Sequence, residues 1–367
     1  TLPDLLRSVP GVQVAEVAPG RFLVSLRSMN GVVGNNVVVT LEGVPINDPL
    51  DGGVEWSAIP FDARDVERIE VVRGPVSAIY GANAYTGVIN IVTYRGYGQL
   101  PVWGVRGNAT FDERGRGAGQ GSFRWARRRD HRELSFMGVG GYDDVFAGTA
   151  SGANPAMTNF GMLGRAAIDV GGGRLEAQIG FTALRRSSLE HLSLARVSEW
   201  HDVATARVQY TTQDLPSVLG AMAIWARALD HRVPSTDASA RSGFSYAGTN
   251  ALRSNLGVDL PFQLHDTLRI TIGGELDVDA VRAPYVVGGT NGLMRMGYGA
   301  YAQGQYDPHP KLSLSGAIRV DRPTVDPTPL LSYRAAAVFH TDRLSIRASA
   351  SSSFRSPTYV ERLGRFV

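Results

Sequence analysis

From about residue 100 to its end, the chain alternates apolar and polar residues with a period of two. Between Leu268 and Ala280, apolar side chains share one face and charged side chains share the other. The runs at 175–183 and 344–355 follow the same pattern. Because successive side chains of a strand point to opposite faces, each run predicts a strand with one apolar face. Runs of nine or more residues match a tilted transmembrane strand, whereas soluble sandwiches use strands nearer five or six residues.

The connections between these runs differ in length in a regular way. Short turns are expected near residues 129–131, 171–173, 213–217, 264–266, 307–311 and 341–343. Longer polar segments fall between them, at 143–159, 186–198, 231–245, 284–293 and 322–330. Short turns at one end and long loops at the other are typical of outer-membrane barrels. We therefore predict a membrane β-barrel domain over residues 99–367, antiparallel and with about 13 strands present.

The composition agrees with strands as the spanning elements. No stretch approaches the ~18 apolar residues that a membrane helix needs, so any spanning structure must be a closed barrel. Charged residues make up only 19% of the chain, and cysteine is absent, which removes disulfides and thiol chemistry. The net charge is +3, and the arginines are spread along the chain without stacking aromatics. A nucleic-acid partner is therefore not predicted.

Residues 1–98 have a different pattern and predict a compact α+β domain. Residues 2–8 predict a short helix, with Pro3 in the first turn, where proline is tolerated. Strands are expected at 13–16, 22–27, 37–41, 66–72 and 87–93. Gly74 and Pro75 end one of them, because proline cannot donate to a strand ladder.

Within this domain, the stretch from Arg68 to Thr93 reads RIEVVRGPVSAIYGANAYTGVINIVT. It resembles the plug domain of TonB-dependent outer-membrane receptors, as do LPDLLRSVPGV and VVVTLEGVPINDP upstream. The sequence SFRSPTYVERL resembles a segment that the family carries partway round its barrel. The resemblance implies a plug lodged in a barrel of 22 strands when complete. It also implies that an energy-coupling box precedes Thr1 and that about nine strands follow Val367.

By this resemblance, the protein is expected in the outer membrane of a Gram-negative bacterium. It would bind a scarce nutrient, such as a ferric siderophore, haem or cobalamin, and import it into the periplasm through plug rearrangement. Expected partners are a TonB-type energy-coupling protein, outer-membrane lipid and lipopolysaccharide, and the small-molecule ligand. No intrinsic cofactor is expected, although the ligand can be a metal chelate. The alternative is a transport-inactive scaffold that keeps the plug–barrel fold among the subunits of an envelope complex.

No catalytic motif points to an enzyme. The chain contains no GxSxG nucleophile motif and no Walker phosphate loop, and no pair of carboxylates is placed together by spacing. His191 and His201 lie near Glu190 and Glu199, but their spacing matches no metal motif. We interpret both histidines as solvated loop residues, and we predict no metal site.

Two plug arginines are candidates for anchoring and gating. Arg27 ends FLVSLR and Arg73 ends VERIEVVR, at positions where plugs of the family carry arginine. The resemblance implies charge pairs with barrel glutamates that hold the plug in the lumen. Glu70 is a further candidate partner, inside the plug. The alternative is a local ion pair without a gating role. Ser28 stands where the family usually has the glycine that follows the first arginine.

The resemblance also places ligand contacts on plug loops that face outward. These loops lie around residues 16–21, 30–36 and 47–55, and a rigid scaffold commonly presents binding groups on such loops. The alternative is that they are ordinary turn residues, since asparagine, aspartate and glycine favour turns. The candidate ligand-binding residues are Arg21, Asn30, Asn35, Asn36, Asn47, Asp48, Asp51 and Glu55.

Overall fold

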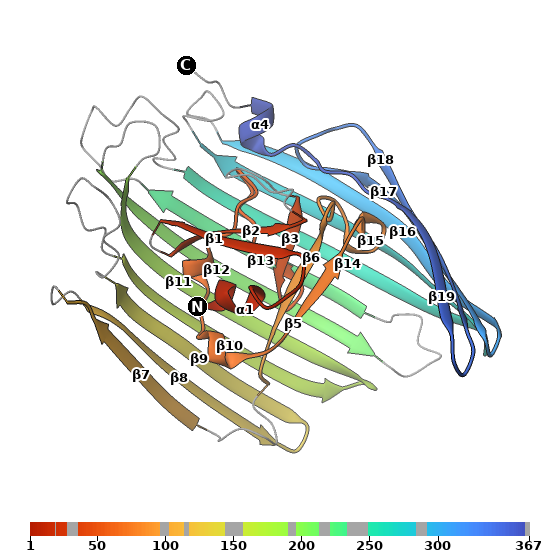
Figure 1. Cartoon of the computed structure of the whole chain (residues 1–367), viewed down its shortest axis with the longest axis horizontal. Coiled ribbons are helices and arrows are strands. Elements are labelled where there is room, and N and C mark those ends of the chain that lie inside the picture. The colour runs from red at the N-terminus through yellow and green to blue at the C-terminus, as the bar shows by residue number, and fades with distance from the viewer. Residues whose placement is uncertain are drawn as a thin grey trace.

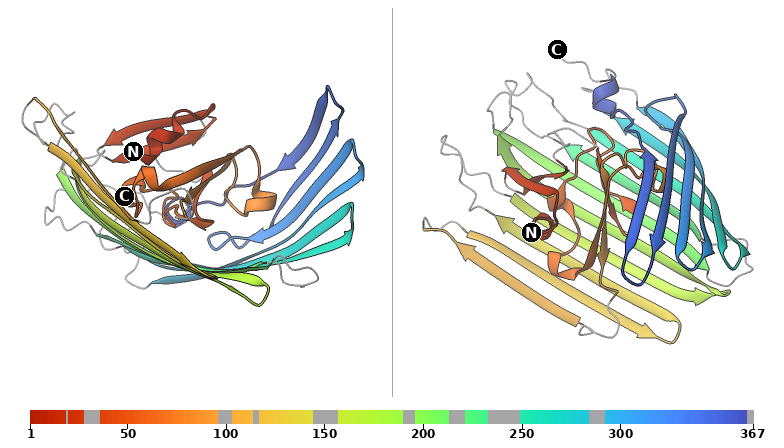
Figure 2. Two further views of the ribbon diagram at one scale, coloured as in Figure 1. Left: turned by 90° about the horizontal axis from the view of Figure 1, so that it is seen from below. Right: turned by 45° about the vertical axis from the view of Figure 1, so that its right-hand side comes forward.

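The computed structural model consists of a small N-terminal domain on the concave face of a broad, curved sheet (Figures 1 and 2). We keep the name plug for the N-terminal domain and call the curved sheet the wall. The predicted boundary between residues 98 and 99 lies outside the described residues. The structure describes residues 1–18, 20–27, 36–95, 103–113, 117–143, 157–189, 196–212, 221–232, 249–283 and 292–363.

The plug contains two separate sheets. Helix α1 (Leu2–Leu6) precedes an antiparallel pair of strands, β1 (Val12–Ala18) and β2 (Arg21–Leu26). A four-stranded sheet follows in the order β4-β3-β6-β5, in which β3 and β6 run parallel. The predicted helix and strands are therefore all present, with ends shifted by a few residues. The elements of the second sheet and its connections are β3 (Val37–Leu41), β4 (Val44–Pro45), η1 (Trp56–Ala58), η2 (Ala63–Asp65), β5 (Val66–Arg73), α2 (Ser77–Tyr80) and β6 (Gly87–Thr93).

The wall is one antiparallel sheet of 13 strands, each hydrogen-bonded to its neighbours in sequence. The predicted number and direction of the strands are thus confirmed. Strands β7 and β19 form its two edges and do not pair with each other. The strands are β7 (Trp103–Phe111), β8 (Gly117–Arg129), β9 (Arg132–Asp143), β10 (Met157–Val170), β11 (Gly173–Leu189), β12 (Arg196–Thr212), β13 (Ala221–Arg232), β14 (Thr249–His265), β15 (Leu268–Arg282), β16 (Leu293–His309), β17 (Leu312–Arg322), β18 (Leu330–His340) and β19 (Ser345–Ser352).

The two ends of the wall differ in their connections. One end carries two-residue turns, such as Asp130–His131 between β8 and β9 and Gly171–Gly172 between β10 and β11. The other end carries the long connections, including residues 323–329, and the helix α4 (Tyr359–Leu363). We call these the turn end and the loop end. Short turns are typical of the periplasmic side of such sheets and long loops of the outer side.

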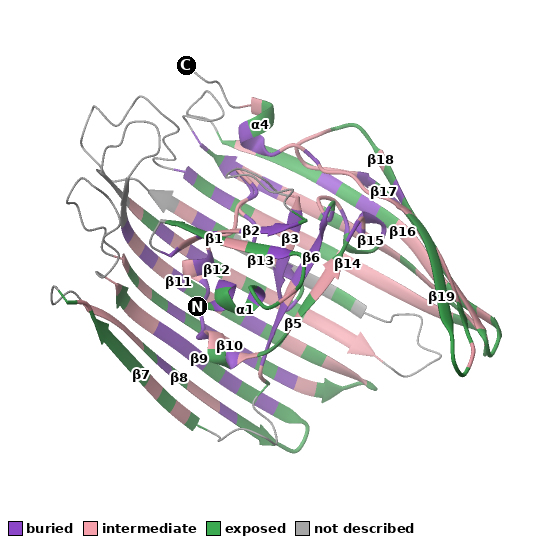
Figure 3. Cartoon of the chain, in the orientation of Figure 1, coloured by how far each residue is buried: buried purple, intermediate pink, exposed green. Residues whose placement is uncertain are grey.

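The convex face of the wall is apolar and exposed. Ile179 and Ile318 are more than half exposed, whereas the residues next to them in sequence, Gln178 and Arg319, are buried. Buried and exposed residues alternate in this way along many strands of the wall (Figure 3). The strands reach 17 residues, more than the ~9–11 needed to cross a bilayer. Within the described residues, none of the helices has the length and apolar character to cross a membrane.

The plug core also includes side chains from the wall. Leu6, Leu26 and Ile91 are fully buried in the plug, and Met137 of β9 and Leu163 of β10 belong to the same cluster. Burial of this kind stabilises the plug against the wall by about 1.5–3 kcal/mol for each large apolar side chain. The plug is therefore packed onto the wall through apolar contacts as well as the polar contacts described next.

Candidate functional site

The plug and the wall are joined by a buried ion pair near the turn end. Glu42 of the plug accepts a hydrogen bond from Arg165 of β10, with Oε1 and Nη2 2.8 Å apart. The same oxygen accepts bonds from the backbone N–H and hydroxyl of Thr93, both at 2.7 Å. Local backbone geometry positions this carboxylate, because Glu42 and Gly43 form a two-residue turn between β3 and β4 with φ of 51° and 84°. The pair therefore connects the ends of two plug strands to the wall.

A second plug carboxylate binds two arginines. Asp65 is buried, and its Oδ1 accepts hydrogen bonds from Arg106 of β7 at 3.0 Å and Arg124 of β8 at 3.2 Å. The short helix η2 presents this aspartate, and Asp62 caps that helix by accepting a bond from the Arg64 N–H. A buried carboxylate needs such partners, since desolvation without them is costly.

A third plug carboxylate belongs to a network at the loop end. Glu55 accepts two hydrogen bonds from Arg186 of β11, at 2.9 and 3.2 Å. Arg186 is fully buried and also donates to Glu199 of β12 at 2.7 Å. Arg21 of the plug lies 3.9 Å from Glu199, and His201 lies 3.7 Å from the same carboxylate. The network thus includes two plug residues and three wall residues.

The charges of this network change the pKa of Glu55. Burial raises the pKa of its carboxyl, but the positive charges of Arg186 and Arg21 and the hydrogen bonds from Arg186 act in the opposite direction and outweigh burial. The pKa of Glu55 is therefore held below its ordinary value of 4.5. Glu55 is ionised at neutral pH and forms a charged, two-pronged contact with the guanidinium.

These contacts have the opposite polarity to the one predicted. The sequence-based expectation was that plug arginines pair with wall glutamates, yet here plug carboxylates bind wall arginines at three places. Two pairs do have the expected polarity: Arg95 with Glu176 at 2.7 Å, and Arg21 with Glu199 at 3.9 Å. Arg95 was not among the predicted residues.

The three predicted anchoring residues do not come together. Arg27 is exposed at the end of β2 with φ of 57°, and its guanidinium has no ion pair among the described residues. Arg73 donates to the backbone oxygen of Pro10 at 2.8 Å, inside the plug. Glu70 binds Arg68 at 2.7 Å and Asn90 at 2.9 Å, and not Arg73. Retention of the plug by Arg27 and Arg73 remains a prediction that these contacts do not test.

The predicted ligand loop at 47–55 lies at the loop end; Glu55 binds Arg186 of the wall, but the other polar side chains have local partners. Asn47 bonds to Val39, Val37 and Gly52 through its amide, and the Asp48 and Asp51 carboxylates accept from N–H groups two residues on. Such bonds are typical of turn residues. Leu50 of this loop is fully buried in an apolar cluster with Tyr359 and Val360 of α4.

The other predicted ligand residues are only partly described. Asn30 and Asn35 lie outside the described residues, as does the whole stretch 28–35. The backbone oxygen of Asn36 accepts bonds from the N–H and hydroxyl of Thr86, both at 2.8 Å. Arg21 belongs to the network at the loop end. Contact of these residues with a ligand therefore remains a prediction.

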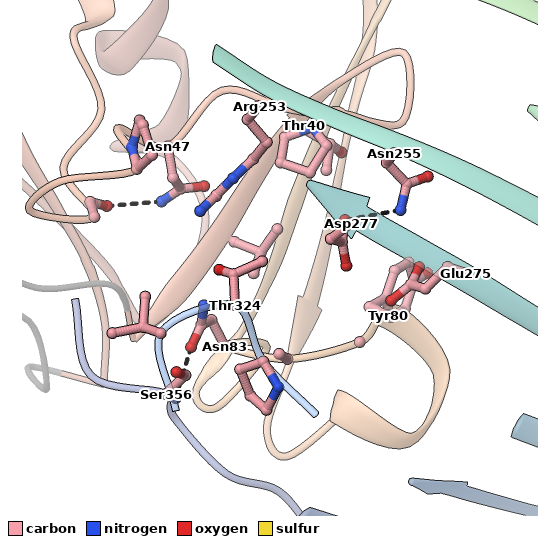
Figure 4. A pocket seen from close by; sticks show the side chains of 18 of the residues that line it. Thr40, Asn47, Tyr80, Asn83, Arg253, Asn255, Glu275, Asp277, Thr324 and Ser356 are labelled. Atoms are coloured by element: carbon pink, nitrogen blue, oxygen red, sulfur yellow. Dashed lines mark hydrogen bonds between the residues drawn. The ribbon is translucent and has the colours of Figure 1, made fainter. Parts of the chain in front are cut away.

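A cavity of about 380 Å³ lies between the plug and the wall (Figure 4). Its plug side includes Thr40 of β3 and the turn that follows α2, and its wall side includes Glu275 and Asp277 of β15. Thr324 and Thr358 line it at the loop end. The size lies within the range of small-molecule sites, which typically measure about 300–1,000 Å³.

The described residues hold no group of three or more metal-binding side chains. One earlier interpretation needs correction here. His201 is not a loop residue, because it lies in β12 and is buried beside Glu199. His191 falls outside the described residues.

The sequence carried a signal for the missed arginines. Each of Arg165, Arg186 and Arg124 lies in a strand whose alternation places it on the concave face. A charged residue at such a position faces the lumen and needs a partner there. Glu42 and Arg165 are 123 residues apart in the chain, so the sequence alone does not predict that these two residues pair.

The plug contains a mixed sheet and lies on the concave side of a wall of long antiparallel strands. This arrangement defines the class of plugged outer-membrane barrels. Comparison with family models agrees. Residues 1–88 match the TonB-dependent Receptor Plug Domain, and residues 102–366 match the TonB dependent receptor-like beta-barrel. The chain belongs to the family of TonB-dependent receptors, which are outer-membrane β-barrels of Gram-negative bacteria.

Curated relatives match over the plug. The vitamin B12 transporter BtuB of Vibrio vulnificus is 38% identical in strain CMCP6 and 41% in strain YJ016, each over 93 residues. BtuB of Vibrio cholerae is 38% identical over the same length. Each match covers 25% of this chain and 15% of the relative.

Solved structures match over nearly the whole chain. The ferric enterobactin receptor PfeA of Pseudomonas aeruginosa superposes with a TM-score of 0.74 at 17% identity, over 98% of this chain and 60% of that one. The siderophore receptor PirA of Acinetobacter baumannii gives 0.74 at 16%, over 97% and 59%. The FrpB iron transporter of Neisseria meningitidis gives 0.74 at 15%, over 99% and 64%. At these identities the likeness shows the shared fold alone.

Proposed function

We propose that this chain belongs to a receptor that binds a scarce nutrient at the outer surface and imports it into the periplasm. The energy would come from a TonB-type partner, and transport would require the plug to rearrange. The nutrient class includes ferric siderophores, haem and cobalamin, and the names of the relatives include a vitamin B12 transporter and siderophore receptors. The protein would act in the outer membrane, surrounded by lipid and lipopolysaccharide, and not as an enzyme. We also propose residues 1–98 and 99–367 as the two domains.

The observation that carries this proposal is how the plug is held. Its carboxylates Glu42, Glu55 and Asp65 meet arginines of four different wall strands, while a cavity remains between plug and wall. These ion pairs fix the plug in one position. Because they are few, a movement of the plug can break all of them. A plug that can be released from the wall, with a cavity of ligand size beside it, suits an importer that opens only during transport.

Uptake in living cells tests the proposal. The gene for the whole protein would be deleted in its source bacterium, and uptake of ⁵⁷Co-cyanocobalamin and of ⁵⁵Fe-loaded siderophores measured. A second strain would lack the TonB-type partner and keep the receptor. We expect loss of uptake of one compound in both strains, with binding retained in the second.

The same experiment addresses the alternative role as a scaffold. If the uptake of every compound is unchanged in both strains, the proposal is contradicted. Together with envelope subunits that copurify with the protein in stable amounts, that result would favour the scaffold.

A further inference from the structure

The cavity between plug and wall is lined by more acidic than basic side chains. Glu275 and Asp277 of β15 are separated by two residues, so both face the lumen and line the cavity (Figure 4). The Oδ1 atom of Asp277 accepts a hydrogen bond from Asn255 at 2.9 Å. Within the part of the chain that the structure describes, Asp277 has no ion pair. Its charge is therefore not neutralised by a guanidinium in contact with it.

The arginines nearby are engaged with other carboxylates. Arg253 forms a two-pronged contact with Asp279, at 2.7 and 2.9 Å. Arg319 contacts both oxygens of Asp321 through Nε, at 2.8 and 2.9 Å, and also pairs with Glu275. Two carboxylates thus share the single charge of Arg319.

The charged group on and directly behind this side of the cavity contains two more carboxylates than guanidiniums. The group consists of Glu275, Asp277, Asp279 and Asp321 with Arg253 and Arg319. Arg207, beside Gly43, adds one positive charge to the lining, and Asp48 adds one negative charge. The lining itself therefore has three carboxylates, Asp48, Glu275 and Asp277, and two guanidiniums, Arg207 and Arg253, which is an excess of one negative charge.

The two carboxylates of β15 present hydrogen-bond acceptors to the cavity. A carboxylate can only accept when ionised, so the remaining oxygens of Glu275 and Asp277 require donors. A cation or an N–H group on a ligand would supply them. An anion would meet like charges in a partly buried cleft, where repulsion is stronger than in water.

We propose that the part of the ligand that enters this cavity carries an ammonium or several N–H donors. The site would exclude polyanionic metal chelates, such as a ferric tris-catecholate. This inference rests on the proposed function and specifies the substrate class of the same protein. The name of the ferric enterobactin receptor among the structural neighbours does not extend to this chain, because the likeness to it shows only the fold.

Isothermal titration calorimetry on the purified whole protein in detergent tests the charge preference. The probes are ferrioxamine B, which carries a free ammonium, its N-acetylated and therefore neutral form, cyanocobalamin, and the trianionic ferric enterobactin. We expect the ammonium form to bind about tenfold more tightly than the acetylated form, and ferric enterobactin to bind most weakly. Asp277→Asn is expected to abolish the tenfold difference.

A matched control keeps the interpretation specific. Asp342→Asn removes an exposed carboxylate in the turn between β18 and β19, outside the cavity, and should leave all affinities unchanged. The inference is overturned if ferric enterobactin binds at least as tightly as the ammonium form, or if Asp277→Asn changes nothing. Binding of no probe up to millimolar concentration also counts against it. The uptake experiment decides the proposed function separately, since it does not depend on the charge of the cavity.

Discussion

Glu42 of the plug and Arg165 of β10 form an ion pair whose two side chains are only 5% and 7% exposed. Thr93 shares the Glu42 oxygen, so the turn after β3 and the end of β6 are attached to the wall at one point. Removing one member of a buried pair leaves the other charge without compensation, which typically costs about 3–5 kcal/mol. This pair is therefore a main determinant of how firmly the plug is held.

Replacing Glu42 should loosen this attachment. For Glu42→Gln we expect amide hydrogen exchange at Thr93 to accelerate by on the order of a hundredfold, because its N–H loses a charged acceptor and Arg165 loses its partner. Exchange mass spectrometry on the purified protein measures the effect. Glu67→Gln, at a half-exposed plug carboxylate, is the control. Equal exchange at Thr93 in both variants would contradict the role given to the pair.

Acid should weaken the contact of Glu55 with Arg186. Because the pKa of Glu55 is lowered in the folded protein, the stabilisation is complete above about pH 4.5 and is lost as the pH falls through the folded value. At pH 7, Glu55→Gln should lower the free energy of unfolding by about 3–5 kcal/mol. The difference from the wild type should shrink below pH 4.5. Thermal or urea unfolding from pH 3 to pH 7 measures it, and a constant difference would argue against this account.

The predicted anchoring by Arg27 and Arg73 can be tested with single alanine variants. If both arginines hold the plug, each variant should release it more readily, as measured by protease sensitivity of the plug in outer membranes and by ligand uptake. The exposed Arg129, the last residue of β8, provides a matched control through Arg129→Ala. Unchanged plug retention and unchanged uptake in both variants would refute the prediction.

The predicted ligand loops can be tested against their local roles. Asp48→Ala with Asp51→Ala removes two carboxylates at the loop end, where each one also caps a turn. If the loop contacts ligand, affinity should fall at least tenfold while the unfolding free energy changes by about 1–2 kcal/mol. Alanine at Gln305 and Asp307, near the turn end, is the control. The idea fails if combined replacements over all three loops leave ligand affinity unaltered.

Much of the fold was predictable because it depends on local periodicity. Alternation along β15 and β19 sets which face meets lipid, and the lengths of the connections set the order of strands. These rules act between residues close in the chain, so the number and direction of the wall strands followed from the sequence. The family resemblance identified the N-terminal domain as a plug. Two of the strands expected there, at 37–41 and 87–93, have the same bounds as β3 and β6.

The site was less predictable because it depends on contacts across the chain. The partners of Arg165, Arg186 and Asp65 lie on other elements, far away in the chain. The local sequence does not determine which plug residue lies opposite which wall residue. The predicted Asn47 and Asp48 proved to have turn contacts, which their residue types favour equally. Resemblance supplied the positions of Arg27 and Arg73, but not the polarity of the ion pairs that this structure forms.

The central claim is that the plug must move against the wall for import. Ser77 of α2 and Ser353, directly after β19, have Oγ atoms 2.5 Å apart, close to the spacing of a disulfide. Residues 1–367 contain no cysteine, so Ser77→Cys with Ser353→Cys creates a single possible bond within this part of the protein. The measurement is ligand uptake by cells that carry this double variant, before and after oxidation.

The account predicts that the oxidised double variant binds ligand like the wild type but imports none, and that a reducing agent restores uptake. Each single cysteine variant should import normally under both conditions. Full uptake by the oxidised double variant, with the disulfide verified by mass spectrometry, would contradict the claim that the plug moves away from this part of the wall.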